Sequence, residues 1–148
     1  MADPALDSAP KRTLKSDVTV MLERTRDEIA AIGELWPRFE RLVGLRGRKM
    51  YALVDLDAGS YAACTPVLAD DDPAAFGLEV GVLPGGWYLS ARIVGDPPGL
   101  YERIGPAMRA LAALAPADAA DPSRPLVEYY RRHNQVELWV PVAADPVG

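Results

Sequence analysis

One acidic residue, Glu128, stands among apolar and aromatic residues in a strand-like stretch of the sequence. It alternates with Leu126 and Tyr130, so these three side chains share one face of the predicted strand. Burying a carboxylate is costly unless a partner compensates for the lost water. A cationic ligand could be that partner, and aromatic rings around it would add cation–π attraction of about 0.5–2 kcal/mol. An internal ion pair with Arg92 or Arg131 would also balance the charge, and the sequence leaves both possibilities open.

Aromatic side chains stand at several positions from which they could reach the same ligand. Trp36 and Phe39 fall on the inner face of a predicted helix, where they could pack in the core, line a pocket, or do both. Tyr61 lies in a predicted strand. Of the neighbours Trp87 and Tyr88 only one can face a groove, because side chains alternate along a strand.

Metal and nucleophilic chemistry find little support in the sequence. The chain has one cysteine, Cys64, and one histidine, His133, so a zinc site built from its own side chains is nearly excluded. We expect Cys64 to be a small buried hydrophobe and His133 to lie in a solvated turn. The acidic run 70–72 is expected to be a solvated loop. We therefore predict no metal and no cofactor.

The composition is that of one ordinary globular domain. The chain has 148 residues, of which 49% are hydrophobic and 25% are charged, and no apolar run is long enough to span a membrane. The formal net charge of -5 argues against binding to a phosphate backbone as the main activity. Arginine outnumbers lysine 13 to 3, which we attribute to a GC-rich genome. Since no secretory signal is evident, we expect a cytoplasmic bacterial protein.

Hydrophobic periodicity predicts several strands and two long helices. Residues 1–16 show no periodicity and are expected to form a mobile arm before a single domain, 17–148. The predicted strands cover 17–24, 49–55, 60–68, 78–83, 87–94, 126–131 and 135–142, and the helices cover about 26–43 and 100–115. The segment 69–77 is expected to be an acidic loop and 116–125 a linker.

The two predicted helices carry distinct local signals. Thr25 and Glu28 have the spacing of a capping box, which would satisfy free backbone amides at the start of the first helix. Pro37 should kink this helix or end its first part, because proline lacks the amide hydrogen and clashes with the preceding turn. Tyr101 opens the second helix, where it could cover a groove or face solvent.

The halves of the chain, about 17–77 and 78–142, repeat one another when the sequence is shifted by 75 residues. Ile29 then falls on Ile104, and both hairpins end in Pro-Val. Each half reads strand, helix, strand, strand. A helix of this length needs a sheet to bury its apolar face, and two half-sheets side by side would carry both helices on one face. The repeat predicts an α+β fold with antiparallel sheets, a pseudo-two-fold axis and a groove between the halves.

Four stretches resemble, in their order and spacing, the GyrI-like small-molecule-binding domain, which is also the effector-binding half of BmrR-type and some AraC-type regulators. They are IGELWPRF (32–39), LVDLDAGSYAAC (53–64), LPGGWYLSARIVG (83–95) and RPLVEYYRRHNQVELWVPV (124–142). The resemblance spans nearly the whole chain and implies a tandem of two strand–helix–strand–strand (SHS2-like) units. The chain departs from the family at Met108 and Ala112, where members commonly carry tryptophan, and at Ile93, where many carry histidine.

The resemblance also implies a site. Family members bind bulky, often aromatic or cationic, drug-like molecules, and the glutamate of the Glu-x-Tyr strand lies in their pocket. The resemblance further favours Tyr88 over Trp87 as a residue of the pocket. The ligand-binding residues that we expect are Glu128, Tyr130, Trp36, Phe39, Tyr61 and Tyr88. Since only about 16 residues precede the domain, we expect a stand-alone module and not a transcription factor by itself.

Three functions remain open. The leading hypothesis is a protein that senses or sequesters a small aromatic or cationic ligand. The second is a hydrolase of cyclopropane-bearing genotoxic compounds, as some GyrI-like proteins are, with Glu128 as catalytic acid–base and Glu137 or Glu79 as candidate second acids. The third is an inhibitor of a DNA-processing enzyme, the role of the founding family member. We expect no direct nucleic-acid partner and no membrane partner, whereas a homodimer could form.

Overall fold

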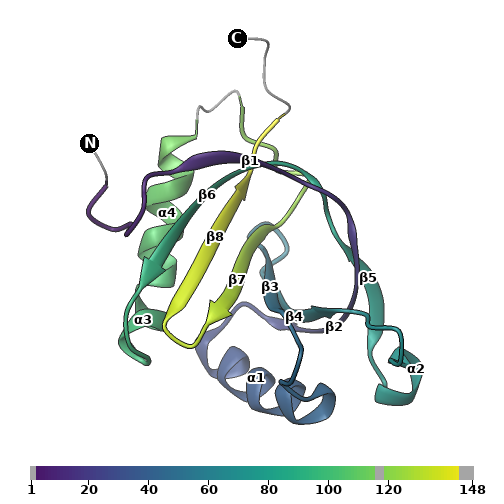
Figure 1. The fold of residues 1–148 in the computed structure, drawn as a ribbon. Helices are drawn as coiled ribbons and strands as arrows, with labels where there is room; N and C mark the ends of the chain where they lie inside the picture. Colours follow the sequence, from purple (N-terminus) through teal and green to yellow (C-terminus); the bar gives the residue numbers. More distant parts are fainter. Residues whose placement is uncertain (1–2, 116–118, 144–148) are drawn as a thin grey trace.

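The computed structural model describes residues 3–115 and 119–143, which build one eight-stranded antiparallel sheet with helices packed against it (Figure 1). The strands are β1 (Lys11–Lys15), β2 (Val18–Arg26), β3 (Met50–Asp55), β4 (Ser60–Pro66), β5 (Glu79–Leu83), β6 (Gly86–Val94), β7 (Leu126–Arg132) and β8 (Gln135–Pro141). The helices are α1 (Ile29–Val43), α2 (Pro73–Phe76), α3 (Gly99–Glu102) and α4 (Ile104–Leu114). None of these helices is both long enough and apolar enough to cross a membrane.

The strand order, β1-β6-β8-β7-β3-β4-β2-β5, has an internal symmetry that confirms the predicted α+β repeat. One half supplies β2, α1, β3 and β4, and the other supplies β6, α4, β7 and β8. The halves meet where β3 pairs with β7, with Met50 opposite Tyr130 and Val54 opposite Leu126. The two half-sheets therefore form one continuous sheet, with the pair β7 and β3 at its centre.

The sheet curls because two long segments of the chain cross it together. β1 leads directly into β2, and β5 leads directly into β6. The segment β1–β2 and the segment β5–β6 run side by side in Figure 1. They pair antiparallel on both sides of their corners, with Lys15 opposite Gly86 and Val18 opposite Leu83. At the crossing, a Cβ on Gly85 would lie 2.7 Å from the backbone nitrogen of Asp17, so only glycine allows this approach.

The two faces of the curled sheet carry different layers. On the outer face, α1 packs over β2 and β4 and α4 over β6 and β8, so both helices cover the same face, as predicted. Leu126 and Tyr130 of β7 touch both of these helix-covered clusters. On the inner face, one apolar cluster draws residues from β2 through β8, including Tyr51, Tyr88 and Trp139. Adjacent residues of one strand therefore serve two separate cores.

Part of the expected mobile arm, 1–16, instead forms strand β1. This strand pairs with β6 from Lys11 opposite Ser90 to Lys15 opposite Gly86. Before this strand, Leu6 is buried among the residues that α4 covers. The Asp7 carboxylate accepts hydrogen bonds from the backbone of Val94 and from Arg103. The edge of β6 needs a partner for its backbone groups, and the segment supplies one without any apolar periodicity. Residues 1 and 2 lie outside the described part.

Several predicted boundaries also move. β2 continues to Arg26, so α1 begins only at Ile29, and the capping box is wrong because Glu28 makes no cap hydrogen bond with its side chain. Its carboxylate instead pairs with Arg26. Pro37 does not end the helix, which continues to Val43. The predicted second helix is divided into α3 and α4, and the predicted loop contains the short helix α2. Residues 116–118 of the predicted linker lie outside the described part.

Candidate functional site

The site lies on the outer face of the sheet, in the region between α1 and α4. β7 contributes Glu128 and Tyr130, β4 contributes Tyr61, and α1 contributes Trp36. Strand alternation puts the carboxylate on the helix-covered face, opposite Ala52 in β3. Glu128 is buried, with 7% of its surface exposed. The structure thus brings together, from both halves, four of the residues that the sequence predicted.

A hydrogen-bond network holds the carboxylate. The Tyr130 hydroxyl donates to Oε1 of Glu128 at 2.5 Å, and the Tyr61 hydroxyl lies 3.4 Å from the same oxygen. The two hydroxyl oxygens are 3.2 Å apart, and the Trp36 indole donates to Tyr61 at 2.8 Å. Among the described residues, no hydrogen bond reaches Oε2 of Glu128. One carboxylate oxygen is therefore held by the protein, and the other remains available.

No cation of the described residues balances this carboxylate. The proposed internal partners lie elsewhere, since Arg131 is 3.9 Å from Glu137 and Arg92 is exposed at the surface. Burial raises the pKa of Glu128 to about 7, although hydrogen bonds from Tyr130 and Tyr61 act in the opposite direction. The charge of Asp27 raises that pKa further. A bound cation would stabilise the ionised form, because it would supply the missing opposite charge.

Aromatic rings enclose the carboxylate. The Trp36 ring lies 5.1 Å from the Tyr130 ring at 67°, and 6.0 Å from the Phe39 ring at 88°. Tyr101 of α3 lies edge-on to Tyr130 at 6.3 Å and is 49% exposed, so it both covers the site and faces solvent. Phe39 is fully buried and belongs to the core beneath Trp36. A bulky ligand could reach Glu128 only if some of these rings moved.

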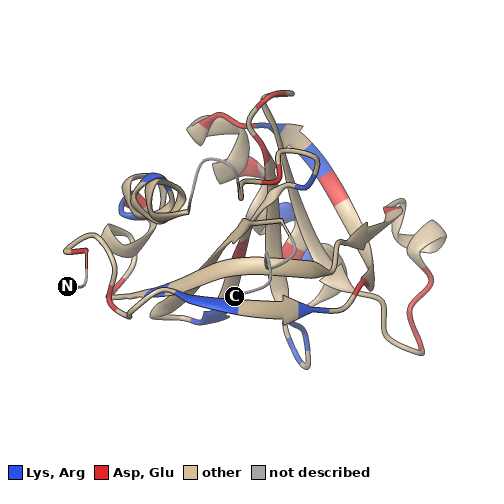
Figure 2. Cartoon of the chain, turned by 90° about the horizontal axis from the view of Figure 1, so that it is seen from above, with Lys and Arg blue, Asp and Glu red and all other residues tan. Residues whose placement is uncertain are grey.

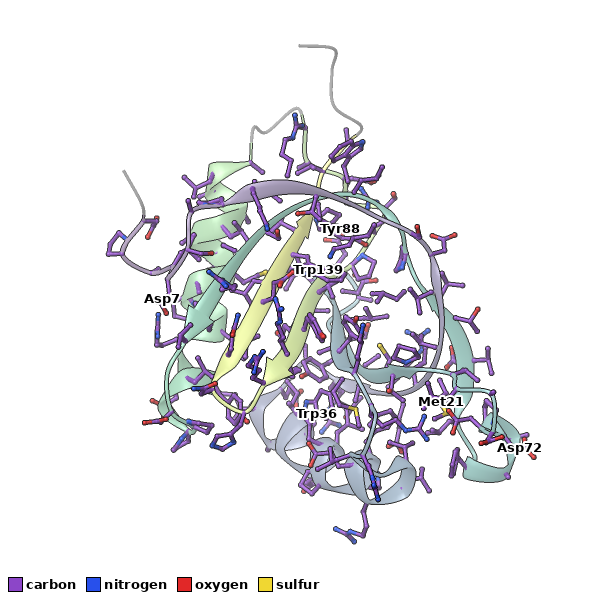
Figure 3. The ribbon with its side chains drawn as sticks, viewed as in Figure 1. Asp7, Met21, Trp36, Asp72, Tyr88 and Trp139 are labelled. Atoms are coloured by element: carbon purple, nitrogen blue, oxygen red, sulfur yellow. The ribbon has the colours of Figure 1, made fainter. Side chains whose placement is uncertain are left out.

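Tyr88 does not lie with the other predicted site residues. It points to the inner face, where its hydroxyl donates to the Pro84 carbonyl at 2.5 Å and its ring lies 5.3 Å from Trp139. Figure 3 shows Tyr88 and Trp139 well separated from Trp36. Trp87 shares its strand face with residues that pack under α4, so Tyr88 lies on the opposite face of the sheet from Glu128. Both faces of β6 bury apolar side chains, so hydrophobicity could not distinguish them.

The candidate second acids also lie away from Glu128. Glu137 accepts a hydrogen bond from the Trp139 indole at 2.7 Å, and Glu79 forms an ion pair with Arg24 at 2.9 Å. The acid that influences Glu128 is Asp27, which precedes α1 and which sequence reasoning did not single out. Its position at the junction of a strand and a helix was the available signal. Cys64 is buried as expected, and burial raises its pKa to about 12, so its thiol is unreactive.

Comparison with solved structures places this arrangement among known folds. An integron cassette protein from the mobile metagenome of Vibrio cholerae is 21% identical, with a TM-score of 0.70 over 90% of this chain and 95% of that chain. The structure of SAV2435 bound to tetraphenylphosphonium is 17% identical, with a TM-score of 0.63 over 91% and 94%. The C-terminal domain of EcmrR is 10% identical, with a TM-score of 0.58 over 93% and 98%.

The chain has the GyrI-like fold. The likeness to these structures covers nearly the whole chain in each case, so the predicted fold is confirmed. Searches of protein-family models and of curated protein sequences give no match. The identities are low, and the shared property is therefore the GyrI-like fold itself.

Proposed function

We propose that the protein binds a small aromatic cation at Glu128, between α1 and α4. The observation that carries this proposal is a buried carboxylate that has tyrosine hydrogen bonds but no cationic partner among the described residues. A ligand cation would provide the missing charge, and Trp36, Tyr101 and Tyr130 would offer ring faces. The likeness to SAV2435, whose structure holds tetraphenylphosphonium, supports this class of ligand.

Binding requires the site to open. The rings of Tyr101 and Trp36 both lie against Tyr130, and neither ring is fully buried. Rotating these side chains would uncover Tyr130 and the Glu128 carboxylate behind it. The backbone of β7 would not have to move, because its neighbours β3 and β8 hold it on both sides. A protein that senses or sequesters its ligand could work in this way.

The test is a calorimetric titration with tetraphenylphosphonium. The wild-type protein should bind it, and Glu128→Gln should weaken binding at least about tenfold, because the substitution removes the charge but keeps the shape. Affinity should also rise between pH 6 and pH 8, since the pKa of Glu128 is about 7 and only the ionised form attracts a cation. This pH dependence should disappear in Glu128→Gln.

The matched control is Glu79→Gln, which removes the same charge from the exposed edge of β5. Its affinity should stay within about twofold of the wild type, because exposed charges are screened by salt. Equal weakening in both variants would mean that net charge, and not this site, attracts the cation. Unchanged binding in Glu128→Gln would reject the proposed site.

The second candidate is a hydrolase that uses the same carboxylate. It rests on the buried Glu128, whose pKa of about 7 suits a general acid or base near neutral pH, and on Asp27 as a nearby second acid. A hydrolase from Listeria innocua has a similar fold, with 10% identity and a TM-score of 0.50 over 90% of this chain and 91% of that chain. Incubation with cyclopropane-bearing compounds would give products heavier by one water. Products that persist in Glu128→Gln would contradict this mechanism.

A further inference from the structure

A cavity on the other side of β1 and β6 from the helix layer has an electrostatic character opposite to that of the Glu128 site. Its volume is about 310 Å³. The residues that line it are Ser8, Ala9, Lys11, Ser90, Ala91, Arg92, Arg131 and Glu137. The volume falls at the lower end of the range for small-molecule sites. The N-terminal segment forms one wall, so the cavity exists only because β1 pairs with β6.

Basic side chains outnumber acidic ones around this cavity. Lys11, Arg92 and Arg131 line it, against the single acid Glu137. Lys11 and Arg92 form no salt bridge with any residue in the described part of the chain. β1 carries three basic residues, and Figure 2 colours basic positions of the chain blue. This excess is unusual in a chain whose formal net charge is -5. Like charges held around one cavity repel one another, and an anion between them would remove that repulsion.

The one acid in the cavity is already engaged. Glu137 accepts a hydrogen bond from the Trp139 indole at 2.7 Å and lies 3.9 Å from Arg131. In the sheet, Arg92 lies directly opposite Glu137, and Lys11 lies directly opposite Ser90. The Ser8 hydroxyl oxygen accepts a hydrogen bond from the Arg92 backbone amide at 2.9 Å, which leaves its own proton free to donate. The cavity thus combines positive charge with one hydroxyl donor, that of Ser8.

We propose that this cavity is a second binding site, specific for a small organic anion that carries a carboxylate or phosphate group. Arg92 and Arg131 would hold the anionic group by charge-assisted hydrogen bonds, and Lys11 would close the site from β1. The proposal is independent of the cation site, because the two sites lie on opposite faces of the sheet. β7 connects them, since Tyr130 faces the cation site and the next residue, Arg131, lines the anion site.

The test adds phenyl phosphate, benzoate and inorganic phosphate separately to ¹⁵N-labelled protein. Binding is monitored by the resonances of the tryptophan indole N–H groups. Phenyl phosphate or benzoate should shift the indole resonance of Trp139, which is hydrogen-bonded to Glu137, and should leave that of Trp36 in place. Tetraphenylphosphonium should do the reverse. Failure of either ligand at its own site therefore tests one proposal without affecting the other.

Charge reversal gives the matched comparison. Arg92→Glu should weaken phenyl phosphate binding at least about tenfold, because it replaces an attraction with a repulsion. Arg46→Glu, at an exposed position outside the cavity, makes the same change in net charge and should weaken binding less than about twofold. The proposal is overturned if no probe shifts Trp139 at low ionic strength, or if both variants lose affinity equally.

Discussion

Asp71 and Glu128 are two carboxylates beside the same helix, and within the described residues only Asp71 is paired with a cation. At the C-terminal end of α1, Arg48 donates to both oxygens of Asp71, at 2.5 Å and 2.7 Å, and also to the Val43 carbonyl. This ion pair lowers the pKa of Asp71 to about 2. Beside the middle of α1, Glu128 has no such cation within the described residues, and burial raises its pKa to about 7.

The difference separates a structural carboxylate from a candidate binding group. The charge of Asp71 is balanced within the chain, so a ligand would gain nothing by approaching it. The charge of Glu128 is unbalanced, and the protein keeps it at a cost that a cation could relieve. The sequence did not predict the ion pair of Asp71 with Arg48, because Asp71 was expected in a solvated loop.

The largest expected effect is a loss of folding stability as the pH rises toward neutral. The pKa of Glu128 in the folded state lies above its ordinary value of 4.5. The contribution of Glu128 to the free energy of unfolding is therefore fully present below pH 4.5 and is lost as pH rises through about 7. The wild type should therefore lose about 3 kcal/mol of unfolding free energy over this range relative to Glu128→Gln. Urea denaturation at several pH values measures this difference. Parallel profiles for the two proteins would show that Glu128 ionises as it would in water.

A smaller effect, of opposite sign, should appear in acid. The pKa of Asp71 is lowered from 3.8 to about 2. Its stabilisation of the folded state is therefore present above pH 3.8 and is lost as pH falls through about 2. Asp71→Asn should be less stable than the wild type at pH 7, and this difference should shrink toward pH 2. Asp70→Asn, at the exposed neighbouring position, is the control and should follow the wild type throughout. A constant difference between Asp71→Asn and the wild type would contradict the ion pair.

The smallest effect concerns the tyrosine that holds Glu128. Tyr130→Phe removes a hydrogen bond of 2.5 Å that lowers the pKa of Glu128, so that pKa should rise by about one unit. Tyr88→Phe removes a hydrogen bond of the same length on the other face of the sheet and should leave the pKa of Glu128 unchanged. Titration of the Glu128 carboxyl carbon by NMR distinguishes the two variants. A shift in neither would mean that burial alone sets this pKa.

Much of the fold could be predicted from local patterns. The two hairpins, the two long helical segments and their order follow from apolar spacing and turn residues, and the repeat then implied that both helices cover one face. Glu128, Tyr130 and Leu126 share a face because strand geometry requires it. The symmetry also contained an unused signal. β5 precedes β6 in one half, and β1 occupies the equivalent position before β2 in the other.

What the sequence by itself determined was the set of elements, their order and which side chains share a face, because these depend on spacing along the chain. Only the tertiary structure decided the rest. It paired β1 with β6 across the sheet, turned Tyr88 inward, joined Arg48 to Asp71 and left Glu128 without a cation among the described residues. Each of these depends on contacts between residues distant in sequence, and such contacts depend on how the sheet curls, which local spacing does not encode.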